Sequence, residues 1–224
     1  MADLYGAGWI DNRSYGCART GSGATHQVGD CGFSPRIKEI LPDPFPNFGR
    51  LDAASKATCY SVALALEDAG FAHPLACGEG VGIIGASQAG CARSDVRYYK
   101  DYIDSGRTSG LSNFFIYTLP SSPVSEASIH FGLQGPLLYT GRTDNIIAGC
   151  AALAMELIEN QEASVMLAGE SGPEGALFMV LAAMSSMEQA PWRSGAETMA
   201  VLRQGGSFPH IARKLADIGN KIVP

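Results

Sequence analysis

The sequence is poor in charge, poor in histidine and without a long apolar run. Charged residues make up 17% of its 224 residues, and 22 Asp and Glu outnumber 16 Lys and Arg. Nucleic acid and anionic membranes require clustered positive charge, so neither is expected as a main partner. The longest apolar run, Ala176 to Met184, is far shorter than a membrane-spanning helix.

The cysteines and glycines indicate neither a metal site nor a cofactor site. The six cysteines include no Cys-x-x-Cys pair, and the spacing of Cys17, His26 and Cys31 matches no common zinc pattern. Glycines 80, 82 and 85 spell G-x-G-x-x-G, but apolar residues between them make this motif itself a strand, whereas a dinucleotide site needs the glycines in the turn after one. The start, Met1 to Leu4, has no basic leader or apolar core, so a reduced cytoplasmic setting is expected.

Strand and helix signals alternate along the chain, which predicts an α/β fold. At 46% apolar, the chain can bury one sizeable core, and we expect a domain over 1–185 and a C-terminal helical extension over 186–224. The expected order is strand 3–9, an irregular connection 16–47, helix 52–69, strand 81–85, helix 95–103, a loop with a short strand 105–120, helix 123–131, strand 137–140, helix 146–158, strands 164–169 and 176–184, and two short helices.

The segment 137–158 is the most informative part of the chain. Residues 137–140 predict a short buried strand, and the helix 146–158 is apolar around nearly its whole circumference. The N-terminus of such a helix stabilises an anion. Asp144 lies at that end and is predicted to cap the helix. Cys150 lies six residues further on, on another face, and is expected to be a small core residue.

Four segments together carry a family resemblance. They are Leu4 to Trp9, the run from Gly49 through the alanine-rich helix that ends Leu-Glu-Asp-Ala-Gly at Gly70, Val81 to Gly85, and Ala127 to Gly169. In this order they resemble the N-terminal half of β-ketoacyl synthases, and the chain is similar to stand-alone proteins that consist of such a half. Aligned without gaps, the family's catalytic cysteine falls on Asp144.

The resemblance implies half of a thiolase-type fold: a mixed five-stranded sheet, flanking helices and a buried central helix. Members that condense acyl chains are about twice as long and take two further catalytic residues, usually histidines, from the second half. The four histidines here, at 26, 73, 130 and 210, lie in no segment that resembles those motifs. The resemblance therefore implies no intact catalytic centre and no condensing activity.

Half of such a fold should leave one face of its central helix uncovered. Either the tail from about residue 186 folds back over that face, or a second subunit covers it. We favour the second subunit, as a homodimer or as a complex with a full-length ketosynthase, because the resemblance also implies pairing of strand 137–140 across a two-fold axis.

The leading hypothesis is a catalytically degenerate ketosynthase-like subunit that supports fatty-acid or polyketide-type chain assembly, by partnering a synthase or by holding an acyl chain. One alternative is an acyltransferase or hydrolase in which Asp144 is the general base and Arg142 or Thr143 stabilises charge. Another is a purely structural dimerisation module.

Two further surfaces have alternative interpretations. The resemblance implies an acyl pocket whose candidate lining residues are Phe114, Phe115, Tyr117, Arg142 and Thr143; otherwise the three aromatic residues pack the core. An acyl-carrier protein would need a local basic patch, and the candidates are Arg93, Arg97, Lys100 and Arg107, which otherwise form an ordinary solvated helix face.

Overall fold

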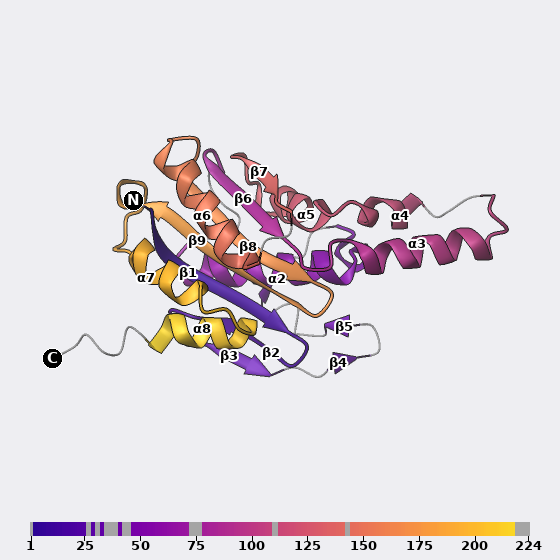
Figure 1. The fold of residues 1–224 in the computed structure, drawn as a ribbon, viewed down its shortest axis with the longest axis horizontal. Coiled ribbons are helices and arrows are strands. Elements are labelled where there is room, and N and C mark those ends of the chain that lie inside the picture. Colours follow the sequence, from indigo (N-terminus) through magenta and orange to yellow (C-terminus); the bar gives the residue numbers. More distant parts are fainter. Residues whose placement is uncertain are drawn as a thin grey trace.

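A computed structural model describes residues 2–25, 28–29, 32–33, 40–41, 46–71, 78–108, 112–141 and 144–217. Its centre is a seven-stranded sheet with the order β3-β2-β1-β9-β8-β6-β7 (Figure 1). β6 runs parallel to β7 and β8, and the other neighbours are antiparallel. The strands are β1 (Ala2–Asp11), β2 (Ser14–Cys17), β3 (Gly23–Thr25), β6 (Val81–Ala86), β7 (Leu137–Tyr139), β8 (Val165–Gly172) and β9 (Gly175–Ala183), and a separate pair joins β4 (Val28–Gly29) to β5 (Gly32–Phe33).

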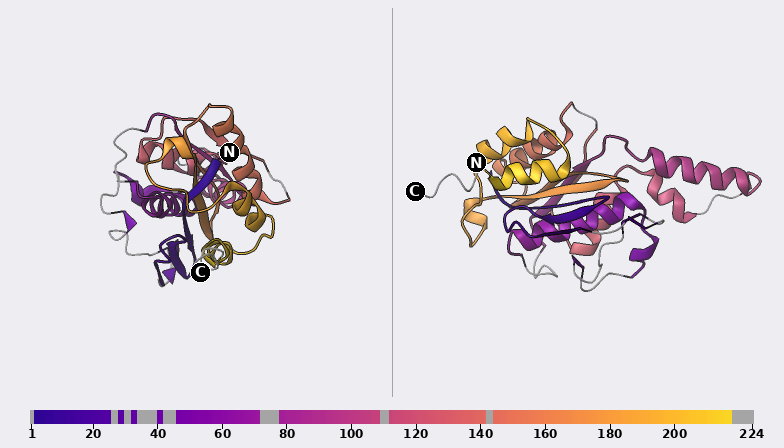
Figure 2. Two further views of the ribbon diagram at one scale, coloured as in Figure 1. Left: turned by 90° about the vertical axis from the view of Figure 1, so that its left-hand side faces the viewer. Right: turned by 90° about the horizontal axis from the view of Figure 1, so that it is seen from below.

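Helices cover both faces of this sheet, which makes a three-layer α/β/α arrangement (Figure 2). Alternate strand residues point to opposite faces, so Ile83 and Phe178 enter one core while Ile84 and Met179 enter the other. The first core lies under α2 (Ala53–Asp68) and α5 (Ser122–Phe131). The second lies under α6 (Ile146–Glu159), α7 (Gly195–Leu202) and α8 (Phe208–Asp217). The predicted α/β fold, with a helix packed at the centre of one face, is confirmed.

Helix α2 fits against β1 because β1 has no side chain where the two backbones meet. A Cβ on Gly8 would overlap the backbone nitrogen of Ala65, and Ser61 Oγ donates to the Gly8 carbonyl at 2.8 Å. Asp52 caps the helix as predicted, since its carboxylate accepts from the Ser55 backbone N–H at 2.8 Å.

The region between β6 and α5 forms an arm that projects from the body (Figure 1). It contains α3 (Ala92–Asp104), α4 (Ser112–Phe115) and the 3-10 turn η2 (Ile116–Thr118). No residue of α3 is buried. The predicted short strand within 105–120 is wrong for the residues that the structure describes there: its aromatic cluster favours a strand by composition, but the segment coils into α4 and η2 and packs beside α3.

Two expectations about the sheet need correction. It has seven strands, not five, because β2 and β3 extend it at the β1 edge within the region predicted to be irregular; their glycine-rich sequences carry little alternating apolar signal. Strand β7 is not buried but forms the opposite edge, and Leu137 and Leu138 keep 39% and 36% of their surface exposed. Its third member, Tyr139, is half-buried.

The predicted C-terminal extension forms α7 and α8, which lie beside α6 on the same face of the sheet (Figure 2). α7 packs against α6 and β1, and α8 packs against β1 and β9. Tail and α6 therefore share one layer. Among the described residues, no helix combines the length and apolarity needed to cross a membrane.

Candidate functional site

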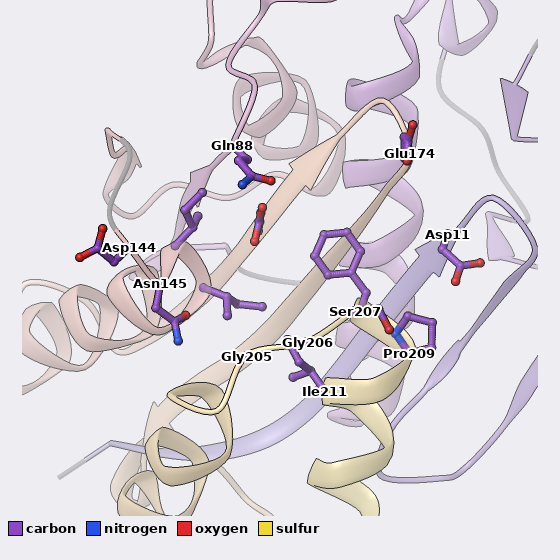
Figure 3. A pocket seen from close by; sticks show the side chains of 14 residues that line it. Asp11, Gln88, Asp144, Asn145, Glu174, Gly205, Gly206, Ser207, Pro209 and Ile211 are labelled. Carbon is purple, nitrogen blue, oxygen red and sulfur yellow. The ribbon is translucent and has the colours of Figure 1, made fainter.

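A cavity of about 600 Å³ lies at the N-terminus of α6. It is bounded by that helix end, by the end of β8 and the β8–β9 turn, and by the connection between α7 and α8 (Figure 3). The cavity is lined by Asp11, Gln88, Asp144, Asn145, Ile146, Ile147, Glu170, Glu174, Gly205, Gly206, Ser207, Phe208, Pro209 and Ile211. Residues from both ends of the sequence thus meet at one helix terminus.

Asn145, not Asp144, caps α6. The Asn145 side-chain oxygen accepts from the Ala148 backbone N–H at 3.2 Å, and its amide nitrogen donates to the Leu202 carbonyl at 2.8 Å. The same side chain therefore closes the helix end and ties it to α7. Asp144 is left exposed at the edge of the cavity, so the predicted capping role is wrong by one residue. Both residue types are good caps, and sequence alone does not separate neighbours.

The cavity is strongly acidic. Four of the residues that line it carry carboxyl groups, namely Asp11, Asp144, Glu170 and Glu174, while none of the described lining residues is Lys, Arg or His. Glu170 follows the buried part of β8, and burial raises the pKa of its carboxyl. This surplus of negative groups opposes the formation of a thiolate or an oxyanion beside them.

None of the described cysteines offers a reactive thiolate at this cavity. Cys150 is fully buried in the core under α6, and burial raises the pKa of its thiol to about 12. Burial likewise raises the pKa of the Cys17 thiol to about 11 and that of Cys59 further. A high thiol pKa means little thiolate at neutral pH. The prediction that Cys150 is a core residue is confirmed.

The three residues whose spacing matched no zinc pattern can be placed only in part. No group of three or more His, Cys, Asp or Glu side chains there could hold a metal ion. Of the three ligands considered, His26 and Cys31 lie outside the described residues, and only Cys17 can be placed.

The other predicted site residues fall into two groups. Arg142 and Thr143 lie outside the described residues. The three aromatic residues belong to the arm and do not line the cavity: Phe114 lies under the Arg97 guanidinium at 4.1 Å, Phe115 is 54% exposed, and Tyr117 packs on the core under α2. They lie apart from Asp144 because α3 carries the chain outward before α4 and η2 return it.

Sequence reasoning missed the side chains that complete the cavity. Glu170 carried a usable signal, because it directly follows the apolar residues of a predicted buried strand and should therefore lie near the carboxyl end of that strand. Gln88 and the Gly205 to Pro209 connection carried none, because their position depends on how the tail packs. Asn145 was overlooked beside Asp144.

Large exposed apolar side chains belong to β7, to α5 and to the arm; α5 contacts both β7 and η2, and η2 contacts α3. Ile129 on α5 is 76% exposed, and Val96 and Tyr99 on α3 are 69% and 64% exposed. We call this the β7-side surface; its members are Val96, Tyr99, Ile103, Phe115, Ile116, Leu119, Ile129, Leu137 and Leu138. By contrast, the outward line of α6 consists of Gly149, Ala152, Leu153 and Glu156, which present little apolar bulk.

Comparison with solved structures shows which fold this is. A chain of the ishigamide ketosynthase/chain length factor matches with a TM-score of 0.62 and 13% identity, over 85% of this chain and 64% of that one. A β-ketoacyl synthase from Burkholderia phymatum STM815 matches with a TM-score of 0.59 and 20% identity, over 82% and 59%. A chain of a type II polyketide synthase acyl-carrier protein in complex with its ketosynthase bound to the hexaketide matches with a TM-score of 0.60 and 12% identity, over 83% and 58%.

These matches confirm a thiolase-type, ketosynthase-like fold. The chain spans about three fifths of the length of the chains that it matches. No protein-family model and no curated protein matches the sequence.

Proposed function

We propose that this chain is a ketosynthase-like subunit that does not condense acyl chains itself and that supports fatty-acid or polyketide-type assembly by partnering a complete ketosynthase. One observation supports the proposal: Asp144, the residue that the sequence resemblance aligns with the family's nucleophile, lies just before the N-terminus of α6 at the edge of an acidic cavity. A carboxylate is a far poorer acyl acceptor than a thiolate, and its acidic neighbours oppose an oxyanion.

The role that we assign is that of the non-condensing member of a pair. A structure of the same fold is named ketosynthase/chain length factor, and a subunit of the second kind fits a chain whose aligned nucleophile is replaced. The proposal includes a second role for the cavity, which is to hold part of an acyl chain. Ile146, Phe208 and Ile211 give the cavity an apolar part for this role.

The β7-side surface is the proposed contact with the partner. An edge strand presents unpaired backbone N–H and C=O groups, and a strand of a second sheet can pair with them. The exposed apolar side chains beside it would be covered in the same step, which is the main driving force for association. Either a ketosynthase or a second copy of this chain could provide that strand, and we propose the ketosynthase.

An acyl-carrier protein is a second proposed partner. Its contact would be the exposed side chains of Arg93 and Lys100 on α3. Arg97 is also exposed but stacks on Phe114, and acidic residues alternate with these cations, so this surface is weaker than the β7-side surface.

Co-purification tests the partnership. The chain is produced with each ketosynthase of its own organism, and the mass of the complex is measured by light scattering. We expect one stable complex with the wild type, and loss of it with Leu138→Asp. The matched control is Met184→Asp, because Met184 is 68% exposed but lies outside the β7-side surface. A complex that survives Leu138→Asp, or the absence of any complex, contradicts the proposal.

Acyl transfer tests the missing chemistry. Radiolabelled acyl-carrier protein is incubated with the chain alone, and covalent label is measured on a denaturing gel. No label is expected on the wild type or on Asp144→Ala. Label that appears on the wild type and disappears in Asp144→Ala refutes the proposed loss of the nucleophile.

The cavity itself favours a second function, hydrolysis or acyl transfer by acid–base chemistry. A carboxyl whose pKa is raised by burial, as at Glu170, holds its proton to a higher pH than an ordinary carboxyl does, which suits acid–base catalysis. In that case the chain alone would cleave simple thioesters, and Glu170→Gln would abolish the activity while leaving the fold intact. Lack of turnover by the wild type excludes this alternative.

A further inference from the structure

The C-terminal extension, residues 186–217 as described, is fastened to the sheet at both of its ends. Its first segment adds to the edge of β1: Leu4 N–H donates to the Arg193 carbonyl at 2.9 Å, and Trp192 N–H donates to the Leu4 carbonyl at 2.8 Å. Gly195 N–H then donates to the Asp3 carboxylate at 2.9 Å. The extension thus enters the sheet before its helices begin.

Arg193 fixes the other end of the extension. Its side chain is only 6% exposed, yet its guanidinium donates to the carbonyls of Leu215 at 3.0 Å and Ala216 at 3.2 Å. These carbonyls belong to the last turn of α8, whose negative dipole end stabilises a cation. A buried charge is tolerated only when it is satisfied in this way. Arg193 therefore closes a loop that holds α8 against the sheet.

The helices of the extension bury the inner face of β1. Leu202 on α7 and Ile211 and Leu215 on α8 are almost fully buried and share one core with Leu4 and Ala7 of β1. Asn145 joins this layer to α6 through the Leu202 carbonyl.

The outer side of the layer is polar. Arg203, Gln204, His210, Arg213 and Asp217 are exposed on α7, α8 and their connection, and Glu156 is exposed on α6. None of the large exposed apolar side chains among the described residues lies on these three helices. A surface of this kind needs no further cover, because little apolar area remains to be removed from water.

We propose that the C-terminal extension completes, within the same chain, the helical layer that contains α6. A partner then contacts this protein as a finished domain through the β7-side surface and never through α6. The part of this statement that concerns the partner rests on the proposed function; the part that concerns the cover does not. It also gives the cavity a wall from the same chain, since Gly205 to Pro209 line it.

The partner is thereby restricted in kind. A complementary half-domain that packs on the outward side of α6 would cover mostly polar or small side chains and would therefore gain little from burying them. A complete chain with a free sheet edge could instead pair with β7 and cover the β7-side surface. The kind of partner that fits is therefore a whole ketosynthase-like chain.

The first test uses the isolated chain. Arg193→Met is compared with Arg213→Met, which removes an exposed arginine from α8. Hydrogen exchange is followed by mass spectrometry, with a dye that fluoresces on apolar surfaces as a second readout. For Arg193→Met we expect at least tenfold faster exchange in β1 and α8 and new dye binding; for Arg213→Met we expect wild-type behaviour. Unchanged β1 protection while α8 exchanges freely overturns the proposed cover.

The second test does not depend on whether Arg193→Met folds. Ala152→Arg places a long cation on the exposed line of α6, where a helix surface accepts it without strain. Unchanged stability and unchanged assembly with the ketosynthase are expected. Loss of assembly by Ala152→Arg shows that a partner does cover α6 and overturns the proposal. If no ketosynthase binds even the wild type, the proposed function fails. The hydrogen-exchange comparison still tests whether the C-terminal extension protects β1.

Discussion

At the scale of single residues, Asp144 and Asn145 before the first turn of α6 have different roles, although both residue types are good helix caps. Asn145 makes two hydrogen bonds that join α6 to its own first turn and to α7, whereas Asp144 remains exposed at the cavity edge. The structural role at this helix end therefore belongs to Asn145 and not to Asp144. Asp144 is free to differ without disturbing the helix that follows it.

Asn145→Ala should therefore destabilise the protein, and Asp144→Ala should not. Loss of the cap and of the bond to Leu202 is expected to lower the free energy of unfolding by about 1–2 kcal/mol, against less than about 0.5 kcal/mol for Asp144→Ala. Urea unfolding followed by circular dichroism measures both. Equal effects of the two substitutions would return the capping role to Asp144.

Glu170 should make stability depend on pH. Burial raises the pKa of its carboxyl, so the folded state binds a proton more tightly than the unfolded state does. The stabilising contribution is complete below the unfolded pKa and is lost as pH rises through the raised folded pKa. Glu170→Gln should therefore gain stability relative to the wild type as pH rises from 4 to 8, measured by thermal unfolding. A constant difference across that range would show that the carboxyl is not desolvated.

At the scale of elements, the end of α2 is fixed to the strand and the loop in front of it. The buried Asp68 carboxylate accepts backbone N–H groups from Ala7 at 2.9 Å, Arg19 at 2.8 Å and Thr20 at 2.9 Å. One side chain at the end of α2 thus satisfies donors from β1 and from the segment after β2. The aspartate of the Leu-Glu-Asp-Ala-Gly sequence, which contributed to the family resemblance, therefore has a structural role.

Asp68→Ala should be severe because it leaves three backbone donors without their acceptor. Hydrogen bonds to a charged group contribute about 1.5–3 kcal/mol each, and the losses here are partly shared, so we expect a loss of at least about 3 kcal/mol. Glu67→Ala, one residue earlier and exposed, is the matched control. Chemical unfolding of both variants gives the comparison, and a loss below 1 kcal/mol for Asp68→Ala would contradict the anchoring role.

At the scale of the whole molecule, the two sides of the sheet differ in what they leave open. The α6 side carries α7 and α8 of the extension, whereas the β7 side ends in an edge strand and in an arm whose helix α3 has no buried residue. The apolar side chains of α3 that face solvent add little to the stability of the monomer. The conformation of the arm should depend on the partner that covers it.

Tyr99→Asp should separate assembly from stability. Because Tyr99 is 64% exposed, the substitution should change the unfolding free energy of the isolated chain by less than about 0.5 kcal/mol. It should weaken binding to the ketosynthase at least tenfold, measured by calorimetry, because a charge would enter an apolar contact. A large fall in the stability of the chain alone would mean that the arm packs on its own body.

The sequence by itself determined the α/β fold and the order of its main elements, because these depend on local periodicity and on residues that follow one another. Only the tertiary structure decided that Asn145 is the cap, that β7 is an exposed edge, and that α7 and α8 of the tail share one layer with α6. Each of these depends on contacts between residues far apart in the chain, such as Asn145 with Leu202 or Arg193 with Leu215, which no local pattern records.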